Sequence, residues 1–396
     1  MTHRERILAG LRRQPVDQLP WVPRLDLWYK ANRYCGTLPP EWADASLMDI
    51  VRNLGVGYHA VIPDFLDVGE PDQAADAALG LHHVANCPAR IRFRRARRIV
   101  RRDGDSIHVR YELPAGELTA RLLYTEAMRR SGVTLLHVQE RVVKRVEDYE
   151  LVAALFEDLE VECAPERYEA LRAAVGDAGL VVAWANIAAS PVHHLLKELV
   201  PYDRFYFDLH DHPEVVLHAA RRMEGYFTGV LEACCRSRAE AVMLGANYDL
   251  MVTPPPLFAE HIEPWLRHAG DALHASGKLL VTHTDGENDR LTRFYVESGV
   301  DVADSVCPAP MTRLTLADYR EQLGDRTAIW GGLCSVCVLP ESVSEAQFEA
   351  HLGEALESIG DGRGIVFSLA DTTPPAASVD RIRRIGEVMA GFGPVR

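Results

Sequence analysis

The chain has 396 residues, of which 47% are hydrophobic and 25% are charged, an ordinary globular composition. Its formal net charge of −14 argues against a general binder of nucleic acid or of anionic membranes. No segment approaches the roughly 18 consecutive apolar residues of a membrane-spanning helix, and the charged N-terminus does not resemble a signal peptide. We therefore expect a cytoplasmic protein whose eight cysteines are reduced thiols.

The N-terminal region is predicted to begin with a short helix over residues 2–13. A first strand follows the turn at 15–20 and ends near Arg24 and Asp26. A second strand is expected at 57–64, with Asp64 at its end. The intervening segment 28–45 is rich in aromatic and turn residues, which predicts a loop over the mouth of a barrel.

Residues 80–140 interrupt this pattern. Alternating apolar and polar residues over 109–119 surround a Pro-Ala-Gly turn, which predicts a hairpin. We expect the region to be a β-rich insertion within a single domain of residues 1–396. Its first part, 90–102, contains eight arginines. A charged strand at a sheet edge is the favoured interpretation, because charge blocks unwanted strand pairing; an anion-binding or partner-docking arm is the alternative.

From residue 147 onward, strand-like and helix-like segments alternate. The strands are short apolar runs, as expected for strands buried on both faces, and they are predicted at 180–186, 241–245, 278–281, 302–306, 328–333 and 365–369. With the two N-terminal strands there are eight, each followed by a helix, which predicts a (β/α)8 TIM barrel. An open doubly wound sheet is the alternative, but no G-x-G-x-x-G turn follows the first strand.

Reactive side chains follow several strands of this pattern. His283 and Asp285 come directly after the apolar run at 278–281, two residues apart, so both side chains can leave one face of an extended chain. The C-terminal ends of barrel strands are where such folds place catalytic residues. The alternative is that the pair only caps the following helix, since Asp is a common N-cap.

A metal site is one interpretation of the last four strand ends. His283, Cys307, Cys334 and Asp371 supply imidazole, thiolate and carboxylate, the three ligand types that zinc accepts. Cys334 and Cys337 form a C-x-x-C pair without a second pair of similar spacing. The alternative is that the cysteines are small apolar packing residues.

Acid–base chemistry without a metal is the other interpretation. His283 with Asp64, Asp285 and Asp371 could transfer protons, provided that burial tunes their pKa values. Arg24 could hold a substrate carboxylate, or it could form a structural ion pair with Asp26. Further candidates for substrate binding are Asp26, beside Arg24, and three residues that follow other strands: Asn186, Asn247 and Asp249.

Several short motifs, in order, resemble the uroporphyrinogen decarboxylase superfamily. They are RERILAGL at 4–11, PVDQLP at 15–20, PLFAEHIEPW at 256–265, HTDG at 283–286, ESGVD at 297–301, GGL at 331–333 and FSLAD at 367–371. The resemblance runs nearly end to end apart from the expected insertion, and it implies a (β/α)8 barrel and a homodimer.

The resemblance points to the methyltransferase-like branch of the superfamily. True decarboxylases have an arginine-rich N-terminal motif and a Gly-His on the last strand; here only Arg24 and Ala370-Asp371 correspond. The zinc-dependent methyltransferases move a methyl group between a corrinoid and a thiol, and they use H-x-C with a later cysteine. The matching residues here are His283, Asp285 and Asp371, so both thiolates are replaced by carboxylates; a harder, oxygen-rich metal site is chemically possible at these positions.

Three functions remain open at this point. The first is transfer of a methyl or one-carbon group, assisted by Zn²⁺ or another divalent metal and linked to a corrinoid on a partner protein. The second is a metal-independent decarboxylase, in which Arg24 binds the carboxylate and Asp64 or His283 delivers the proton. The third is a non-catalytic barrel that binds a partner through its arginine-rich segment.

Overall fold

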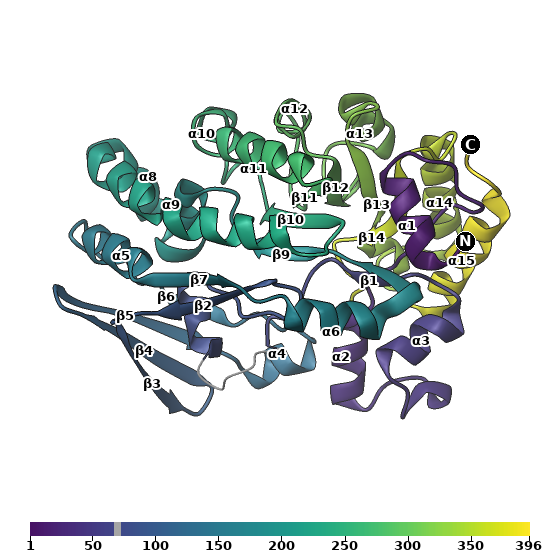
Figure 1. The fold of residues 1–396 in the computed structure, drawn as a ribbon. Helices are drawn as coiled ribbons and strands as arrows, with labels where there is room; N and C mark the ends of the chain where they lie inside the picture. The colour runs from purple at the N-terminus through teal and green to yellow at the C-terminus, as the bar shows by residue number, and fades with distance from the viewer. Residues whose placement is uncertain (67–72) are drawn as a thin grey trace.

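The computed structural model of the chain describes residues 1–66 and 73–396. Six parallel strands form one continuous sheet through the middle of the molecule (Figure 1). In spatial order they are β9 (Ala183–Asn186), β10 (Ala241–Ala246), β11 (Leu279–His283), β12 (Val302–Val306), β13 (Ala328–Cys334) and β14 (Ile365–Ala370). Nearly all of their residues are buried, which explains their continuous apolar runs.

The N-terminal strands join this sheet through few contacts. β1 (Tyr58–Ala60) pairs with β8 (Gly179–Val181), which leads into β9. The segment around Trp21 lies between β14 and β1. It exchanges two backbone hydrogen bonds with β14, from Val22 N–H to Phe367 O and from Phe367 N–H to Pro20 O, both at 2.9 Å, and it accepts one from Gly57 N–H at Trp21 O, also at 2.9 Å. The predicted parallel α/β architecture is therefore confirmed, whereas the eight strands do not form one continuous closed sheet, because the first predicted strand is reduced to isolated bridges.

Helices alternate with the parallel strands along the chain and pack outside them (Figure 1). Several begin with Ser or Thr N-caps that satisfy free backbone N–H groups. The helices are α1 (His3–Leu11), α2 (Asp26–Cys35), α3 (Leu47–Leu54), α4 (Glu126–Arg130), α5 (Asp148–Glu157), α6 (Glu166–Val175), α7 (Pro191–His194), α8 (Tyr202–Asp211), α9 (Pro213–Arg236), α10 (Pro255–His261), α11 (Glu263–Ala275), α12 (Thr292–Glu297), α13 (Leu316–Leu323), α14 (Glu345–Ile359) and α15 (Val379–Phe392). Shorter helical turns cover Pro40–Trp42, Gln73–Leu79, Gly176–Ala178, Leu195–Leu199 and Ser335–Val338.

A second, antiparallel sheet lies at one end of the molecule, away from α13–α15 (Figure 1). Its order is β3 (Arg97–Asp103), β4 (Ser106–Leu113), β5 (Gly116–Leu123) and β6 (His137–Glu140). The turn between β4 and β5 falls at Pro114-Ala115, where the sequence pattern placed it. A separate pair joins β2 (Ala89–Phe93) to β7 (Leu159–Cys163).

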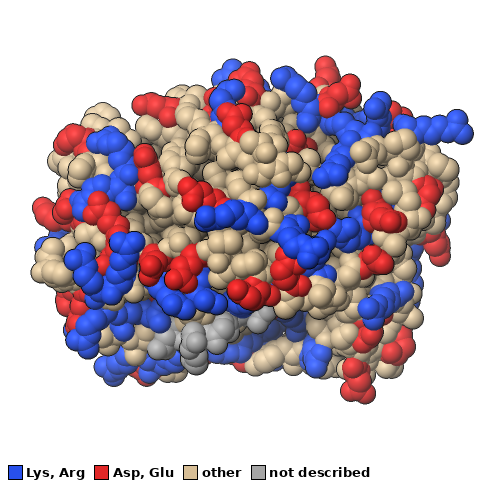
Figure 2. Space-filling model, viewed as in Figure 1, with Lys and Arg blue, Asp and Glu red and all other residues tan. Residues whose placement is uncertain are grey.

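The arginine-rich segment contributes to β2 and to β3, which is an edge strand. Four of its arginines, Arg90, Arg95, Arg97 and Arg98, form ion pairs with acids of the same chain. Arg95 contacts Asp158 at 3.2 Å, and Arg98 contacts Asp76. On the face shown in Figure 2, basic and acidic side chains are interspersed. These pairs favour the charged-edge interpretation of the segment over a free anion-binding arm.

One further finding concerns the predicted elements. The segment 28–45 was expected to be a loop, but its first part belongs to α2, which buries Trp28, Tyr29 and Ala31.

Within the described residues, no helix has both the length and the apolar character that a bilayer crossing requires.

Candidate active site

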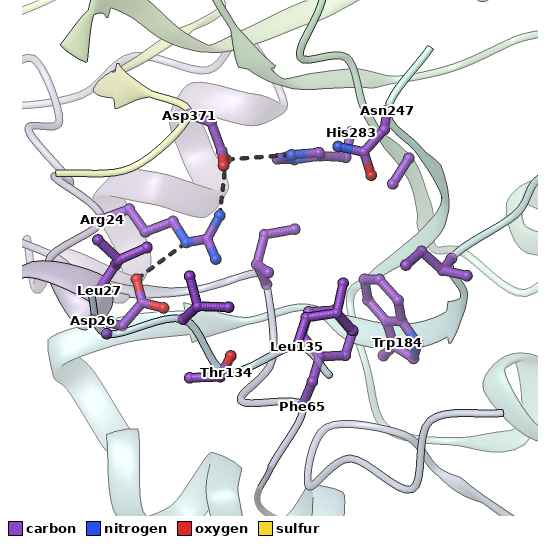
Figure 3. Close-up of a pocket in the computed structure, with 15 residues that line it drawn as sticks. Arg24, Asp26, Leu27, Phe65, Thr134, Leu135, Trp184, Asn247, His283 and Asp371 are labelled. Atoms are coloured by element: carbon purple, nitrogen blue, oxygen red, sulfur yellow. Dashed lines mark hydrogen bonds and ion pairs between the residues drawn. The ribbon is translucent and has the colours of Figure 1, made fainter. Parts of the chain in front are cut away.

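A pocket of about 680 Å³ opens at the C-terminal ends of the parallel strands (Figure 3). One side is polar and is formed by Arg24, Asp26, Asn247, His283 and Asp371. The facing side is apolar and includes Phe65, Leu135 and Trp184 (Figure 3), and further apolar lining residues are Leu27, Ile62, Val133 and Ile187. A few convergent polar groups opposite an apolar wall are typical of small-molecule sites.

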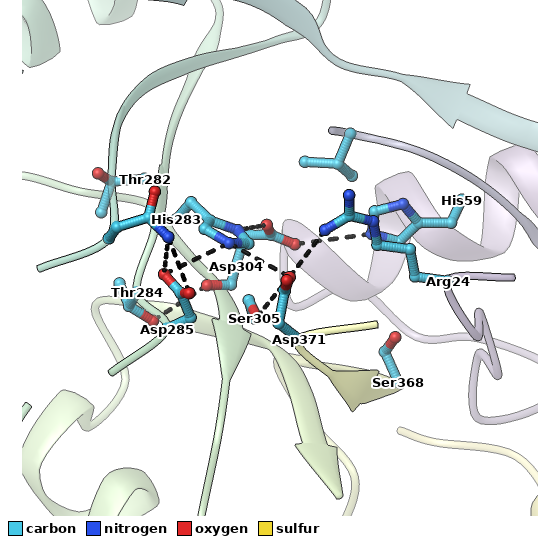
Figure 4. Close-up of polar contacts among 12 residues, drawn as sticks. Arg24, His59, Thr282, His283, Thr284, Asp285, Asp304, Ser305, Ser368 and Asp371 are labelled. Carbon is cyan, nitrogen blue, oxygen red and sulfur yellow. Dashed lines mark hydrogen bonds and ion pairs between the residues drawn. The ribbon is translucent and has the colours of Figure 1, made fainter. Parts of the chain in front are cut away.

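His283, the last residue of β11, lies at the centre of the polar side (Figure 4). Its Nδ1 is 2.6 Å from Asp304 Oδ2, while its Nε2 is 3.3 Å from Asp371 Oδ1 and 3.5 Å from Asp285 Oδ1. Burial alone would lower the pKa of His283, but the carboxylates outweigh burial and raise it to about 10. Without a metal, the imidazole is therefore protonated at neutral pH.

Arg24 connects this cluster to the start of α2. Its Nε donates to Asp26 Oδ1 at 3.1 Å and its Nη1 donates to Asp371 Oδ1 at 2.8 Å. Burial opposes the charge of Arg24, yet the two carboxylates raise its pKa further. Burial would also raise the pKa of Asp371, but Arg24 and His283 hold it well below its usual range. Asp371 is thus an ionised carboxylate shared between a guanidinium and an imidazole.

Asp285 is held from its other side by an amide. Asn247 Nδ2 donates to both carboxylate oxygens of Asp285 at 2.8 Å, and Asn247 Oδ1 accepts from Lys197 Nζ at 2.6 Å. Burial is the largest influence on Asp285 and raises its pKa, against the neighbouring positive charges. The same burial lowers the pKa of Lys197. The result is a chain of contacts from Lys197 to His283.

Two important residues were not among the sequence candidates. Asp304 is a buried residue of β12 and holds His283 by its Nδ1, and the Nε2 of His59 lies 3.9 Å from its other oxygen. Burial lowers the pKa of His59 to about 4, so this second imidazole is neutral. A usable signal existed for Asp304: it is the only charged residue in the apolar run 302–306, and a buried carboxylate requires a partner.

The donor atoms around His283 fit a divalent metal. Among the residues that the structure describes, His283, Asp285 and Asp371 form one group whose ligand atoms lie within 4.8 Å of one another. Three ligands with an open position are typical of catalytic zinc, and oxygen-rich sets also suit harder ions. A carboxylate on the second nitrogen, as Asp304 provides, is the usual support for a metal-binding histidine.

The two cysteines proposed as metal ligands lie outside this group. Cys307 Sγ is 3.8 Å from Ala370 O, and burial raises its pKa to about 12. Cys334 Sγ is 3.2 Å from the sulfur of Cys337. Of the four expected ligands, the structure therefore brings together His283 and Asp371.

Three other candidates do not line the pocket of His283. Asp64 forms an ion pair with Lys30 and lines a neighbouring pocket. Asn186 Oδ1 accepts from the backbone N–H of Ala188 at 3.2 Å. Asp249 accepts from backbone N–H groups of two loops, at Met251 and Glu287. These contacts hold loops together, whereas Arg24, Asp26 and Asn247 do line the pocket.

Comparison with known proteins identifies a sequence family and solved structures with a similar fold. Residues 132–391 match the sequence model of a protein family described as uroporphyrinogen decarboxylase (URO-D). The structure is similar to that of a methyltransferase from Methanosarcina mazei, with a TM-score of 0.58 and 14% sequence identity over 99% of each chain. At that identity the likeness shows a shared fold. No curated protein matches the sequence.

Proposed function

The chain belongs to the uroporphyrinogen decarboxylase family, and from this premise we propose that it is a methyltransferase-like enzyme that moves a methyl or another one-carbon group to or from a small molecule. We propose a (β/α)8 TIM barrel as its fold and a single domain over residues 1–396, with the antiparallel sheet as an insertion. One of the solved structures that it resembles is named a methyltransferase, which supports this branch of the superfamily.

The observation that carries the proposal is the convergence of His283, Asp285 and Asp371, two of which, His283 and Asp371, line the polar side of the pocket. These residues would hold Zn²⁺ or another divalent ion. Bound there, the metal would supply Lewis acidity, which lowers the pKa of an acceptor group. Asp304 fixes the orientation of His283, Asn247 fixes Asp285, and Arg24 fixes Asp371.

The apolar side of the pocket would receive the remainder of the small molecule. Phe65, Leu135 and Trp184 face the polar end across the cavity (Figure 3). Their side chains would exclude water from the reacting group. The family resemblance carries two further proposals, a corrinoid-carrying partner protein and a homodimer.

Metal content is the first test. We expect untagged protein to contain close to one equivalent of a divalent metal, and the His283→Ala and Asp371→Asn variants to lose it. Asp64→Asn is the matched control, because Asp64 lies in the neighbouring pocket, and it should retain the metal. Wild-type protein that takes up no metal, even after zinc or manganese is added, would refute this mechanism.

Methyl transfer is the second test. Metal-loaded protein is mixed with methylcobalamin and a panel of thiols, and the absorption of methylcobalamin is followed. The methyl group would pass from cobalt to sulfur, with the bonding electron pair remaining on cobalt. We expect His283→Ala to abolish the change and Asp64→Asn to preserve it. Unchanged methylcobalamin with every thiol would contradict transfer in this direction.

A metal-independent carboxy-lyase is the second candidate, favoured by a specific observation. Arg24 lines the same pocket as a histidine whose raised pKa keeps it protonated, so a carboxylate-binding group and a proton donor face one cavity. Carbon dioxide release from a carboxylated substrate that survives chelation and is lost in Arg24→Met would support this candidate. Activity that requires the metal would exclude it.

A further inference from the structure

A pair of thiols lies outside the pocket of His283 and has no part in the proposed function. β13 ends at Cys334, and Cys337 follows within the helical turn Ser335–Val338. The two sulfur atoms are 3.2 Å apart, and both residues are buried. Sulfur atoms this close need only a small approach to form a bond of about 2.05 Å.

The thiols can be reached from a cavity of their own. A pocket of about 790 Å³ is lined by both cysteines, by Leu316 and by His351, and it shares no lining residue with the pocket of His283. Each cysteine exposes only 1% of its surface. A small reagent can reach such a sulfur, whereas a bulky disulfide such as oxidised glutathione cannot approach along the axis that exchange requires.

The two sulfurs differ in their surroundings, although either thiol can donate in the contact between them. Hydrogen bonds with the Cys337 side chain and with the backbone of Cys337 and Val336 lower the pKa of Cys334, whereas the contact with Cys334 and burial raise that of Cys337. The thiolate is the nucleophile in cysteine oxidation. Cys334 is therefore the sulfur that reacts first, and Cys337 stands within reach to resolve the product.

We propose that Cys334 and Cys337 form an oxidation site for small hydroperoxides and close to an intrachain disulfide. The thiolate of Cys334 attacks one peroxide oxygen, the O–O bond breaks, and hydroxide leaves, which gives a sulfenic acid. The sulfur of Cys337 then attacks that sulfenic sulfur, the S–S bond forms, and water leaves. The dithiol loses two electrons and two protons, and hydrogen peroxide is reduced to two molecules of water.

Cys334 and Cys337 are connected through backbone and side-chain contacts to β14, α14 and α15. Cys334 pairs in register with Ala370 of β14, and Ala370 directly precedes Asp371. Arg381 donates to the backbone oxygen of Cys337 at 3.0 Å and also pairs with Glu345, so α15 and α14 hold the turn in place. The dithiol is thus built into the end of a core strand.

The test uses the full-length reduced protein. It is treated with a small excess of hydrogen peroxide or, in parallel, with oxidised glutathione, then denatured, alkylated and mapped by peptide mass spectrometry. We expect peroxide to remove two alkylatable thiols, those of Cys334 and Cys337, with a crosslinked peptide two hydrogens lighter. Oxidised glutathione should modify neither residue.

Variants assign the two roles. Cys337→Ser should accumulate a sulfenic acid at Cys334 that dimedone traps, and Cys334→Ser should leave Cys337 as a free thiol. Cys234→Ser, in the adjacent Cys234-Cys235 pair of α9, is the matched control and should form the crosslink as the wild type does. Full alkylation of Cys334 and Cys337 after peroxide would overturn the proposal, as would oxidation confined to the exposed Cys35 and Cys163. Wild-type peptide mapping decides the matter even where a variant fails to fold.

Discussion

At the scale of single residues, Asp304 fixes the orientation of the His283 imidazole through Nδ1, although Asp304 itself does not line the pocket. The Asp304→Asn variant removes the carboxylate partner of Nδ1 while preserving side-chain volume. Because such supporting carboxylates orient the ring and raise its basicity, we expect metal affinity to fall by about 10–100-fold. The measurement is a titration with zinc, read by calorimetry.

A second Asp–His pair provides the control for this variant. Asp301 contacts Nε2 of His274 at 2.8 Å near the start of β12, at a partly exposed site. Asp301→Asn also removes an acidic partner of a histidine, but it should leave metal affinity within experimental error. Equal losses in both variants would show that charge alone, and not the orientation of His283, governs binding.

The raised pKa of His283 also predicts how stability depends on pH. An unfolded histidine titrates near pH 6.5, whereas His283 in the folded, metal-free protein has a pKa of about 10. The folded state therefore binds more protons between these values. The contribution of His283 to stability is complete below about pH 6.5 and is lost as the pH rises through 10.

We expect the free energy of unfolding to fall between about pH 7 and about pH 9.5, by up to about 1.4 kcal/mol per pH unit. Urea unfolding of the wild type and of His283→Gln at several pH values measures the effect, because other alkaline titrations are common to both proteins. Parallel pH curves for the two proteins would contradict the assigned protonation state.

The residues of the site were predictable to different extents. Arg24, His283 and Asp371 follow predicted strands, and the parallel direction of those strands brings them to one edge. Asp304 and His59 act through contacts between strands, so their roles depend on register, which a single sequence does not specify. Cys307 and Cys334 were predicted as metal ligands but lie outside the ligand group, since the position of a residue at a strand end does not specify the direction of its side chain.

At the scale of elements, the segment after α4 forms part of the pocket wall and packs closely against α2. A Cβ at Gly132 would lie 2.3 Å from Leu27 O, and φ there is +76°. We expect Gly132→Ala to destabilise the protein by about 1–3 kcal/mol, the usual effect of overpacking, in addition to the cost of a left-handed conformation. Urea unfolding is the measurement.

Gly104 gives the matched comparison for this substitution. Its φ of +55° is also left-handed, but an added Cβ meets no atom within 4 Å. Gly104→Ala therefore reports the conformational cost alone, about 1 kcal/mol. A Gly132→Ala variant no less stable than Gly104→Ala would show that the segment and α2 can move apart freely.

The helices and strands were also predictable from the sequence to different extents. β10 to β14 were visible in the sequence because each is a short apolar run buried on both faces. α2 was missed because its aromatic and polar composition resembles that of a loop, although Trp28 and Ala31 occur at helical spacing and Gly36 ends the helix with a φ of +67°. The helix is stabilised by burial of Trp28 and Tyr29 in the hydrophobic core, a tertiary contact that the local sequence pattern does not encode.

At the scale of the whole molecule, a resident metal should stabilise the fold. Its ligands come from β11, from the loop that follows β11 and from the end of β14, so binding joins parts of the chain far apart in sequence. At a free metal concentration 100 times the dissociation constant, we expect about 2.7 kcal/mol of added stability. Thermal unfolding with and without zinc measures it, and Asp285→Asn should lose the increase while Asp64→Asn keeps it. An equal increase in both variants would indicate binding elsewhere.

The origin of the pocket wall has a consequence for how new activities can arise in this protein. The polar residues stand on or beside the parallel strands, whereas Val133 and Leu135 come from the connection between α4 and β6, outside that sheet. Substitution or lengthening of this connection can reshape the cavity without touching the catalytic candidates. A combinatorial library restricted to residues 133–135 would therefore sample new substrates while the reacting groups stay constant.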